Sequence, residues 1–306
     1  MTLRQLEVFL AVARDKSFSL AAKRIHLSQP TASEHMQELE KELGAALFAR
    51  RGRAIAMTEA GRVFEAYAAR IMSDVADARQ AITELDGLKR GSLLIGASTT
   101  PGIYLLPSLI GHFRARHPGI ELRLDIANSR IIEQRVKANE LDLGVVGGHE
   151  LARGEACLAA GLLDELVLVV PPHHPWAHRR DIPPTVLGEQ PLLVREEGSA
   201  TRRVTERSLA NAGLKYTVRM ELGHTEAIKQ AVMAGLGVAF VSVYAISGEV
   251  AMGRLAALRL RGLPIRRHFH VIHNEDRALG ASARAFLQHL NALRAKPPAL
   301  PPLRKT

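Results

Sequence analysis

Four short polar segments stand where a predicted strand ends and a predicted helix begins. The carboxyl ends of strands in an open α/β sheet meet at one edge, and helix N-termini there present unpaired N–H groups that attract an anion. Taken singly, each segment is better explained as a helix cap, but their convergence favours a site for a small anionic ligand. The side chains that we expect at this ligand are Ser98, Thr99, Thr100, Asn128, Ser129, Ser199, Thr201, Arg202, His224 and Thr225.

Arg202 provides the positive charge that such a site needs. A planar guanidinium can hold a carboxylate, a phosphate or a sulfur oxyanion through two parallel hydrogen bonds. The charge distribution agrees: residues 1–90 hold 14 Lys and Arg against 12 Asp and Glu, which leaves 27 of the 41 basic and 19 of the 31 acidic residues for residues 91–306. We therefore expect a small anionic ligand, and no other cofactor, metal or catalytic residue.

A second set of polar side chains, near the N-terminus, has the character of a DNA-reading surface. Ser28 to His35 opens the last helix of a three-helix pattern, and a basic hairpin at Leu47 to Arg53 follows. Small polar side chains on the exposed face of such a helix can meet base edges or phosphates. The residues that we expect at double-stranded DNA are Ser28, Gln29, Pro30, Thr31, Ser33, Glu34, His35, Arg50, Arg51 and Arg53.

Apolar periodicity and capping signals predict the helices that position these residues. Apolar side chains from Leu3 to Ala13 repeat at three- and four-residue steps, so the first helix should end near Asp15-Lys16. Ser19 is a plausible N-cap for the second helix. The third begins with Pro30 close to its first position and ends before Gly44. Its inward side chains are predicted to be Ala32, Met36, Leu39 and Leu43.

A long helix is predicted from Thr58 to about Lys89. At about 1.5 Å per residue it would be on the order of 45 Å long, too long for its apolar stripe to be covered by a sixty-residue head. We expect a second copy of the chain to cover the stripe, although packing against the chain's own domains is the alternative. The stripe consists of Phe64, Tyr67, Ile71, Val75, Ala78, Ile82 and Leu85.

From Gly91 onward strands alternate with helices, which is typical of an α/β domain with a mostly parallel sheet. The pattern repeats, so two similar lobes are predicted. Strands are expected at 92–97, 120–126, 141–146, 166–170, 192–194, 216–221, 238–241 and 269–272. Helices are expected at 102–116, 129–138, 201–212, 226–234 and 281–293. The Pro-rich basic tail, residues 296–306, is expected to be extended.

Several motifs together resemble those of LysR-type transcriptional regulators, across the whole chain before the tail. They are Leu6-Glu7-Val8-Phe9, Phe18-Ser19-Leu20-Ala21-Ala22, Leu27 to Ser33, Leu39 to Gly44, Leu47-Phe48-Ala49-Arg50 and Thr58-Glu59-Ala60-Gly61. The run from Gly198 to Arg202 also resembles an effector-site motif of the branch that includes regulators of sulfur assimilation and carbon fixation.

This resemblance implies an N-terminal all-α winged helix-turn-helix at 1–57, a dimerising linker helix at 58–90, and a two-lobed α/β effector domain at 91–295 that is similar to periplasmic binding proteins. Lobe I would comprise about 91–162 and 267–295, and lobe II about 163–266; the return of the last strand and helix to lobe I rests on the resemblance alone. The family implies a homodimer, often a homotetramer, that bends promoter DNA. Contact with RNA polymerase is left open.

Glu34 departs from the family pattern, which is frequently basic or neutral at this position. A carboxylate near phosphates is repelled, yet it could accept a hydrogen bond from a cytosine amino group or orient a neighbour such as Arg51. A merely solvated side chain is the third interpretation, and the sequence does not choose among them.

Three other classes of protein fit the sequence less well. An enzyme is disfavoured because no Gly-x-Gly-x-x-Gly follows a strand and there is neither a phosphate-binding Lys loop nor a Gly-x-Ser-x-Gly elbow. A metal sensor could use His173-His174 or the pair His268 and His270, but no acidic or cysteine partners stand at ligand spacing. A periplasmic solute-binding protein would match residues 91–295 only. The attached N-terminal head and the lack of a signal-peptide pattern argue against this class.

The remaining composition fits a cytoplasmic protein. The single Cys157 cannot form an intrachain disulfide, and we expect it to be a packed small residue. No stretch approaches the roughly 20 apolar residues of a membrane span, and the first residues lack the pattern of a signal peptide. No contact with a membrane is expected.

Overall fold

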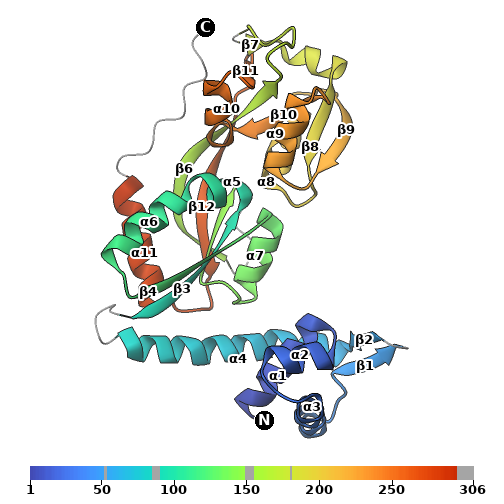
Figure 1. Cartoon of the computed structure of the whole chain (residues 1–306), viewed down its shortest axis with the longest axis vertical. Coiled ribbons are helices and arrows are strands. Elements are labelled where there is room, and N and C mark those ends of the chain that lie inside the picture. The colour runs from blue at the N-terminus through green and yellow to red at the C-terminus, as the bar shows by residue number, and fades with distance from the viewer. Residues whose placement is uncertain (52–53, 85–89, 149–154, 180, 295–306) are drawn as a thin grey trace. The chain divides into compact units, whose positions relative to one another are not determined.

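The computed structural model describes residues 1–51, 54–84, 90–148, 155–179 and 181–294 (Figure 1). The predicted Pro-rich tail and Arg53 lie outside these residues. The chain forms two compact units, one from residues 1–83 with 138–140 and the other from residues 84–137 and the chain from 141 onward.

The first unit begins with three helices, α1 (Leu3–Asp15), α2 (Phe18–Arg24) and α3 (Gln29–Leu43). The N-cap of α2 is Ser17, whose hydroxyl accepts from the Leu20 N–H, and the prediction of Ser19 was wrong. The cause is Lys16, which adopts left-handed φ and ψ of 49° and 30° and so ends α1 one residue before the cap. Ser28 caps α3 and Gly44 ends it with a φ of 66°.

The core of this unit is built from the inward faces of the helices and from aromatic side chains. Phe9 lies at the centre, 5.4 Å from the Phe48 ring and 5.0 Å from the Phe64 ring between centroids. Ala32, Met36 and Leu39 are buried as predicted, but Leu43 is 40% exposed because α3 extends past the core in its last turn.

The strands β1 (Phe48–Arg51) and β2 (Ala54–Met57) form the predicted hairpin as an antiparallel pair. One Glu40 oxygen accepts from the N–H groups of Leu47 and Phe48, at 2.7 and 3.1 Å, so the start of the hairpin is tied to α3. The hairpin is therefore held by the same helix that carries the predicted DNA-reading residues.

The long helix is α4 (Glu59–Glu84), and residues 85–89, with Leu85, lie outside the described part. Its predicted stripe divides into two kinds of residue. Phe64 and Ile71 pack against the core of the head, whereas Tyr67 and Ile82 are 63% and 70% exposed. Tyr67 and Ile82, which we call the outer part of the stripe, are thus exposed to solvent in a single chain.

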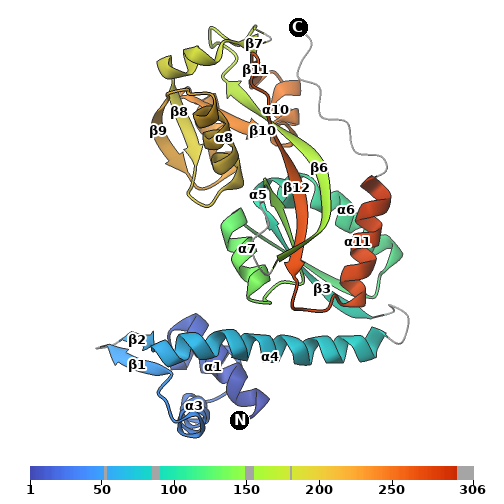
Figure 2. The ribbon, with the colours of Figure 1, turned by 180° about the vertical axis from the view of Figure 1, so that it is seen from behind.

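One ten-stranded sheet runs through the second unit, in the order β4-β3-β5-β12-β6-β10-β8-β9, with β11 paired to β6 and β7 paired to β11. Figure 2 shows β6 and β12 side by side through the middle of this unit. The strands are β3 (Gly91–Ser98), β4 (Ile120–Ala127), β5 (Leu143–Gly147), β6 (Glu155–Val170), β7 (Asp181–Ile182), β8 (Pro191–Arg195), β9 (Thr217–Leu222), β10 (Val238–Ser242), β11 (Ala256–Leu260) and β12 (Ile265–Asn274).

We call the part built on β3, β4 and β5 lobe I and the part built on β8, β9 and β10 lobe II. Within each lobe these strands pair in parallel, while β6 and β12 pair with each other antiparallel and cross between the lobes. β12 also pairs with β5, and Phe286 packs in the same core as Leu93, so β12 and the helix that carries Phe286 return to lobe I. β6 is far longer than predicted, because it serves both lobes.

Helices cover both lobes. They are α5 (Thr99–Tyr104), α6 (Leu106–Arg116), α7 (Ser129–Lys137), α8 (Ala200–Asn211), α9 (Thr225–Met233), α10 (Ser247–Ala251) and α11 (Ala281–Arg294), with 3-10 turns η1 (Pro184–Glu189) and η2 (Val243–Ala245). The single helix predicted at 102–116 is wrong: it is two helices separated at Leu105, because the ring of Pro107 would clash with the carbonyl of Ile103 in a continuous helix.

Candidate functional site

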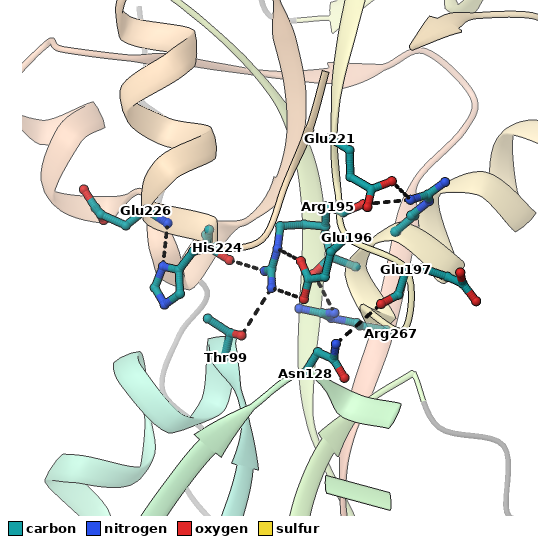
Figure 3. A network of polar contacts seen from close by, with 12 residues as sticks. Thr99, Asn128, Arg195, Glu196, Glu197, Glu221, His224, Glu226 and Arg267 are labelled. Atoms are coloured by element: carbon teal, nitrogen blue, oxygen red, sulfur yellow. Dashed lines mark hydrogen bonds and ion pairs between the residues drawn. The ribbon is translucent and has the colours of Figure 1, made fainter. Parts of the chain in front are cut away.

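A small pocket, partly open to solvent, lies between the lobes, where strands of both lobes end (Figure 3). Lobe I contributes the ends of β3 and β4 with the starts of α5 and α7, and lobe II contributes the end of β8 with the start of α8. The lining residues are Ser98, Thr99, Thr100, Asn128, Ser129, Arg195, Ser199, Ala200, Thr201 and Arg267. Most of the side chains predicted at a ligand therefore meet here.

Arg195, the last residue of β8, was not predicted and is 5% exposed. Its Nε and Nη2 donate to the two carboxylate oxygens of Glu196, at 2.7 and 2.9 Å. Nη1 donates to the Thr225 hydroxyl at 2.6 Å, and Nη2 also reaches the Thr99 hydroxyl of lobe I at 3.3 Å. Thr225 thus contributes by holding Arg195 instead of lining the pocket.

Arg267 enters the pocket from the crossover strand β12 and was also not predicted. Its Nε donates to Asp164 at 2.7 Å, and the Ser242 hydroxyl donates to the other oxygen of that carboxylate at 2.6 Å. Nη2 and Nη1 donate to Thr100 of lobe I at 3.2 Å and to Thr201 of lobe II at 3.0 Å. Complete burial raises the pKa of Asp164, which the Arg267 charge and the Ser242 hydrogen bond oppose.

Two hydroxyl-bearing helix starts face the same space. Ser129 begins α7, is 1% exposed, and its hydroxyl has no hydrogen-bond partner among the described residues. Ser199 stands before α8 and makes no side-chain capping bond. A buried donor without a partner costs free energy unless a ligand or water satisfies it. Together with two guanidinium groups, these helix starts can bind a multi-oxygen anion.

The lobes also touch through the loop that follows β8. The Asn128 side chain donates to the Glu197 carbonyl at 3.4 Å, and the Arg130 N–H donates to the Gly198 carbonyl at 3.2 Å. Arg130 further pairs with the Glu197 carboxylate at 2.8 Å, on the exposed rim. The loop between Arg195 and Ser199, two residues that line the pocket, therefore contacts lobe I directly.

Arg202 and His224 lie apart from this pocket. Arg202 donates to Glu206 at 2.8 Å and to Glu221 at 2.6 Å, and these hydrogen bonds raise its pKa. It lines a different pocket in lobe II, and its charge is already balanced by two carboxylates. The His224 Nδ1 accepts from the Glu226 N–H, so this imidazole caps α9.

The side chains predicted at DNA gather at the start of α3. Ser28 and Thr31 are joined by their hydroxyls at 2.8 Å, and Gln29 donates to Ser33 at 3.2 Å. The Glu34 side chain is exposed. Pro30 is exposed and His35 half-buried, while the side chains of Arg50 and Arg51 lie outside the described part. The start of α3 thus presents a row of small polar groups to solvent.

The histidines considered as metal ligands form no site. His268 and His270 lie with ring centroids 6.4 Å apart, and His174 accepts from the Trp176 N–H through Nδ1. Across the described ranges, no three His, Cys, Asp or Glu side chains gather as a metal ion would need. The side chain of Cys157 lies outside the described part.

Comparison with known proteins identifies the architecture. Residues 3–62 match the model of the bacterial regulatory helix-turn-helix proteins of the lysR family, and residues 86–294 match the model of the LysR substrate binding domain. The chain is a LysR-family transcriptional regulator. It binds DNA through its head and carries an effector-binding domain, and regulators of this family are not enzymes.

Individual relatives cover nearly the whole regulator. It is 38% identical, over 94% of both chains, to the RuBisCO operon transcriptional regulator of Allochromatium vinosum. The structure of the Synechocystis PCC6803 CcmR regulatory domain in complex with 2-PG is 32% identical, with a TM-score of 0.65, and covers 69% of this chain and 100% of that one. A full-length OxyR variant from Pseudomonas aeruginosa is 25% identical, covers 95% of both chains and has a TM-score of 0.73.

The regulator has no membrane-spanning helix in the residues that the structure describes.

Proposed function

We propose that this regulator senses a small anionic metabolite of the 2-phosphoglycolate type, with a phosphate and a carboxylate, held between lobes I and II, and that it changes its promoter binding in response. The observation that carries the proposal is the convergence of two buried guanidinium groups, those of Arg195 and Arg267, on one pocket lined by hydroxyl groups. The related CcmR regulatory domain binds 2-phosphoglycolate, an anion with a phosphate and a carboxylate.

The two arginines suit an anion that has two charged ends. Arg267 is fixed by Asp164 through Nε, so its two terminal nitrogens point toward the hydroxyls of Thr100 and Thr201. An oxyanion placed there would receive charge-assisted hydrogen bonds from both nitrogens. The start of α8 offers free N–H groups beside it, which favours a phosphate at this end. Arg195 then remains for the second charged group.

Such a ligand would favour one arrangement of the lobes over another. Thr99 and Thr100 belong to lobe I, Thr201 belongs to lobe II, and Arg267 lies on a strand that connects them. A ligand that bonds to both sides stabilises the arrangement in which the two sides are close, and it shifts the equilibrium only by its difference in affinity for the two arrangements. We infer that this shift changes how the DNA-reading heads of an oligomer are spaced.

The oligomer is part of the proposal. The outer stripe of α4, with Tyr67 and Ile82 exposed, supports dimerisation through this helix, since paired heads read paired half-sites. Residues from Ser28 to His35, with the arginines of the hairpin, would contact the operator. We propose that the target genes belong to a carbon-fixation operon, as the name of the Allochromatium relative indicates. We further propose assembly to a tetramer, as the family resemblance implies, contact with RNA polymerase, and a cytoplasmic location.

Thermal unfolding of the full-length protein with and without 2-phosphoglycolate tests this function, because a ligand of the native state raises the melting temperature. We expect a rise for the wild type, its loss in Arg195→Gln and in Arg267→Met, and its retention in Arg202→Gln. Arg202 is the matched control, since it is an arginine of lobe II whose charge is already paired. No rise in the wild type, or a loss confined to Arg202→Gln, would reject the proposed site.

A further inference from the structure

The hydrogen-bonding capacity of Arg195 is almost completely used within the chain. Four of its five N–H groups are engaged: two by Glu196, one by Thr225 and one by Thr99. The edge formed by Nε and Nη2 is the one that binds a carboxylate with two parallel hydrogen bonds, and Glu196 occupies both positions. A ligand that is to pair with this edge must replace a carboxylate of the protein (Figure 3).

The Glu196 side chain is placed so that it can be replaced. It is 20% exposed, and among the described residues Arg195 is its only side-chain partner. Its backbone is fixed on both sides, because its N–H donates to Leu222 and its carbonyl accepts from Ser199, both at 3.2 Å. Rotation of the side chain into water therefore requires no change in the loop that carries Ser199.

The counter-ion of the second arginine is different. Asp164 is completely buried, receives a hydrogen bond from Ser242, and stands opposite Arg267 in the register of β6 and β12. Removal of this carboxylate from its place would leave a buried charge without a partner, which is strongly unfavourable. Of the two carboxylates beside the pocket, Glu196 can rotate away from its arginine, whereas Asp164 cannot.

The charges of the pocket explain why one acid must leave. Arg195 and Arg267 together with Asp164 and Glu196 have a formal sum of zero in the empty site. A ligand with a phosphate and a carboxylate, added to this set, would place at least two excess negative charges in a poorly solvated space. When the Glu196 side chain is rotated out into solvent, the formal charges of Arg195, Arg267 and Asp164 add up to +1. The edge of Arg195 that binds a carboxylate is then open.

We propose that Glu196 is an exchangeable counter-ion that holds Arg195 in the empty site and is displaced by the anionic group of the ligand. The proposal rests on the proposed function, since it concerns the same pocket. Glu196 then sets the affinity threshold: an anion that binds Arg195 less well than the attached carboxylate does not enter. Glu196 therefore limits which anions bind and also stabilises the unliganded pocket. One substitution should change these two properties in opposite directions for the ligand and for the unliganded protein.

Isothermal titration of the full-length protein with 2-phosphoglycolate, for the wild type and for Glu196→Gln, tests this role. Without the competing carboxylate the dissociation constant should fall by about tenfold, the factor that ~1.4 kcal/mol represents. In the same variant the melting temperature of the unliganded protein should fall, because Arg195 loses its charged partner. If Glu196 had only a structural role, the variant would both bind the ligand less tightly and melt at a lower temperature. A counter-ion role predicts tighter binding by a protein that melts at a lower temperature.

Glu221→Gln is the matched control, because it removes the same charge from an exposed side chain of lobe II that pairs with Arg202 outside the pocket. Its dissociation constant should change by less than about twofold, as expected for an exposed ion pair. A similar gain in both variants would assign the effect to net charge and overturn the proposal.

Glu196→Asp provides a second variant that keeps the charge on a shorter side chain and should bind more tightly than the wild type but less tightly than Glu196→Gln. Equal or weaker binding by both Glu196 variants, when the wild type binds, would also overturn the counter-ion role. If neither the wild type nor the folded variants bind 2-phosphoglycolate, the proposed function itself fails, and the counter-ion role fails with it.

Discussion

Asp164 and Arg267 stand opposite each other on the two crossover strands and form an ion pair at 2.7 Å in which the carboxylate is completely buried. Because β6 and β12 connect the lobes, this pair lies at the junction that a change in lobe arrangement must involve. It also directs the two terminal nitrogens of Arg267 toward Thr100 and Thr201 of the pocket. One buried interaction thus joins the two crossover strands to a side chain that lines the pocket.

Asp164→Asn should destabilise the effector domain strongly. Loss of the charge leaves Arg267 buried without a counter-ion, and breaking a buried pair in this way costs about 3–5 kcal/mol. Denaturant unfolding followed by circular dichroism measures the change. Asp181→Asn, which breaks an exposed pair with Arg261, should have little effect, and equal losses in the two variants would contradict the importance of burial.

His289 should make the stability of the effector domain fall in mild acid. Burial, helped by the charge of Arg116, lowers the pKa of this imidazole below its ordinary value of 6.5. The unfolded chain therefore takes up a proton on this imidazole at a higher pH than the folded chain. The contribution of neutral His289 to the free energy of unfolding is fully present above pH 6.5 and decreases as the pH falls below that value.

His289→Phe tests this pH dependence, since the His289 ring packs against Phe113, which already packs against another phenylalanine, Phe286. Melting temperatures between pH 7.5 and 5.5 should fall less steeply for the variant than for the wild type. Parallel curves for the two proteins would exclude His289 as a cause of acid sensitivity.

Ile82→Asp should weaken dimerisation. This side chain is 70% exposed on the outer part of the α4 stripe, and a charge there would be buried against the partner helix. Sedimentation velocity measures the shift toward monomer. Met252→Asp is a control of matched exposure, 71%, on lobe II. A dimer that withstands Ile82→Asp would remove the α4 stripe from the interface.

Glu34→Ala should change which operator sequence is preferred, with a cost or gain of about 1–3 kcal/mol at the base pair that it reads. Its exposed position at the start of α3 is compatible with contact to a base edge. Selection of binding sites from a random DNA pool compares the variant with the wild type. An unchanged consensus would assign Glu34 to the solvated surface.

The segments that line the pocket could be predicted because a general rule places them. Thr99, Thr100, Ser129 and Thr201 each follow a strand, and the ends of parallel strands meet at one edge of a sheet. That rule needs only the local alternation of strands and helices, which the sequence of this domain displays clearly.

The two arginines of the pocket could not be predicted in this way. Arg267 is one of two adjacent arginines in β12, and only its long-range register with Asp164 decides that it points inward. Arg195 ends a buried strand, and its role depends on Thr99, which is distant in sequence. Arg202 was chosen instead because it shares a segment with Ser199, but Glu206 and Glu221 take up its charge.

A crystal structure of the full-length protein grown with 2-phosphoglycolate tests the central claim most directly. We expect the anion in the pocket between the lobes, bonded to Arg267 and Thr201, with its second charged group on Arg195 and the Glu196 side chain rotated out into solvent. Density for the ligand beside Arg202, or an empty pocket with the Arg195–Glu196 pair intact, would contradict it.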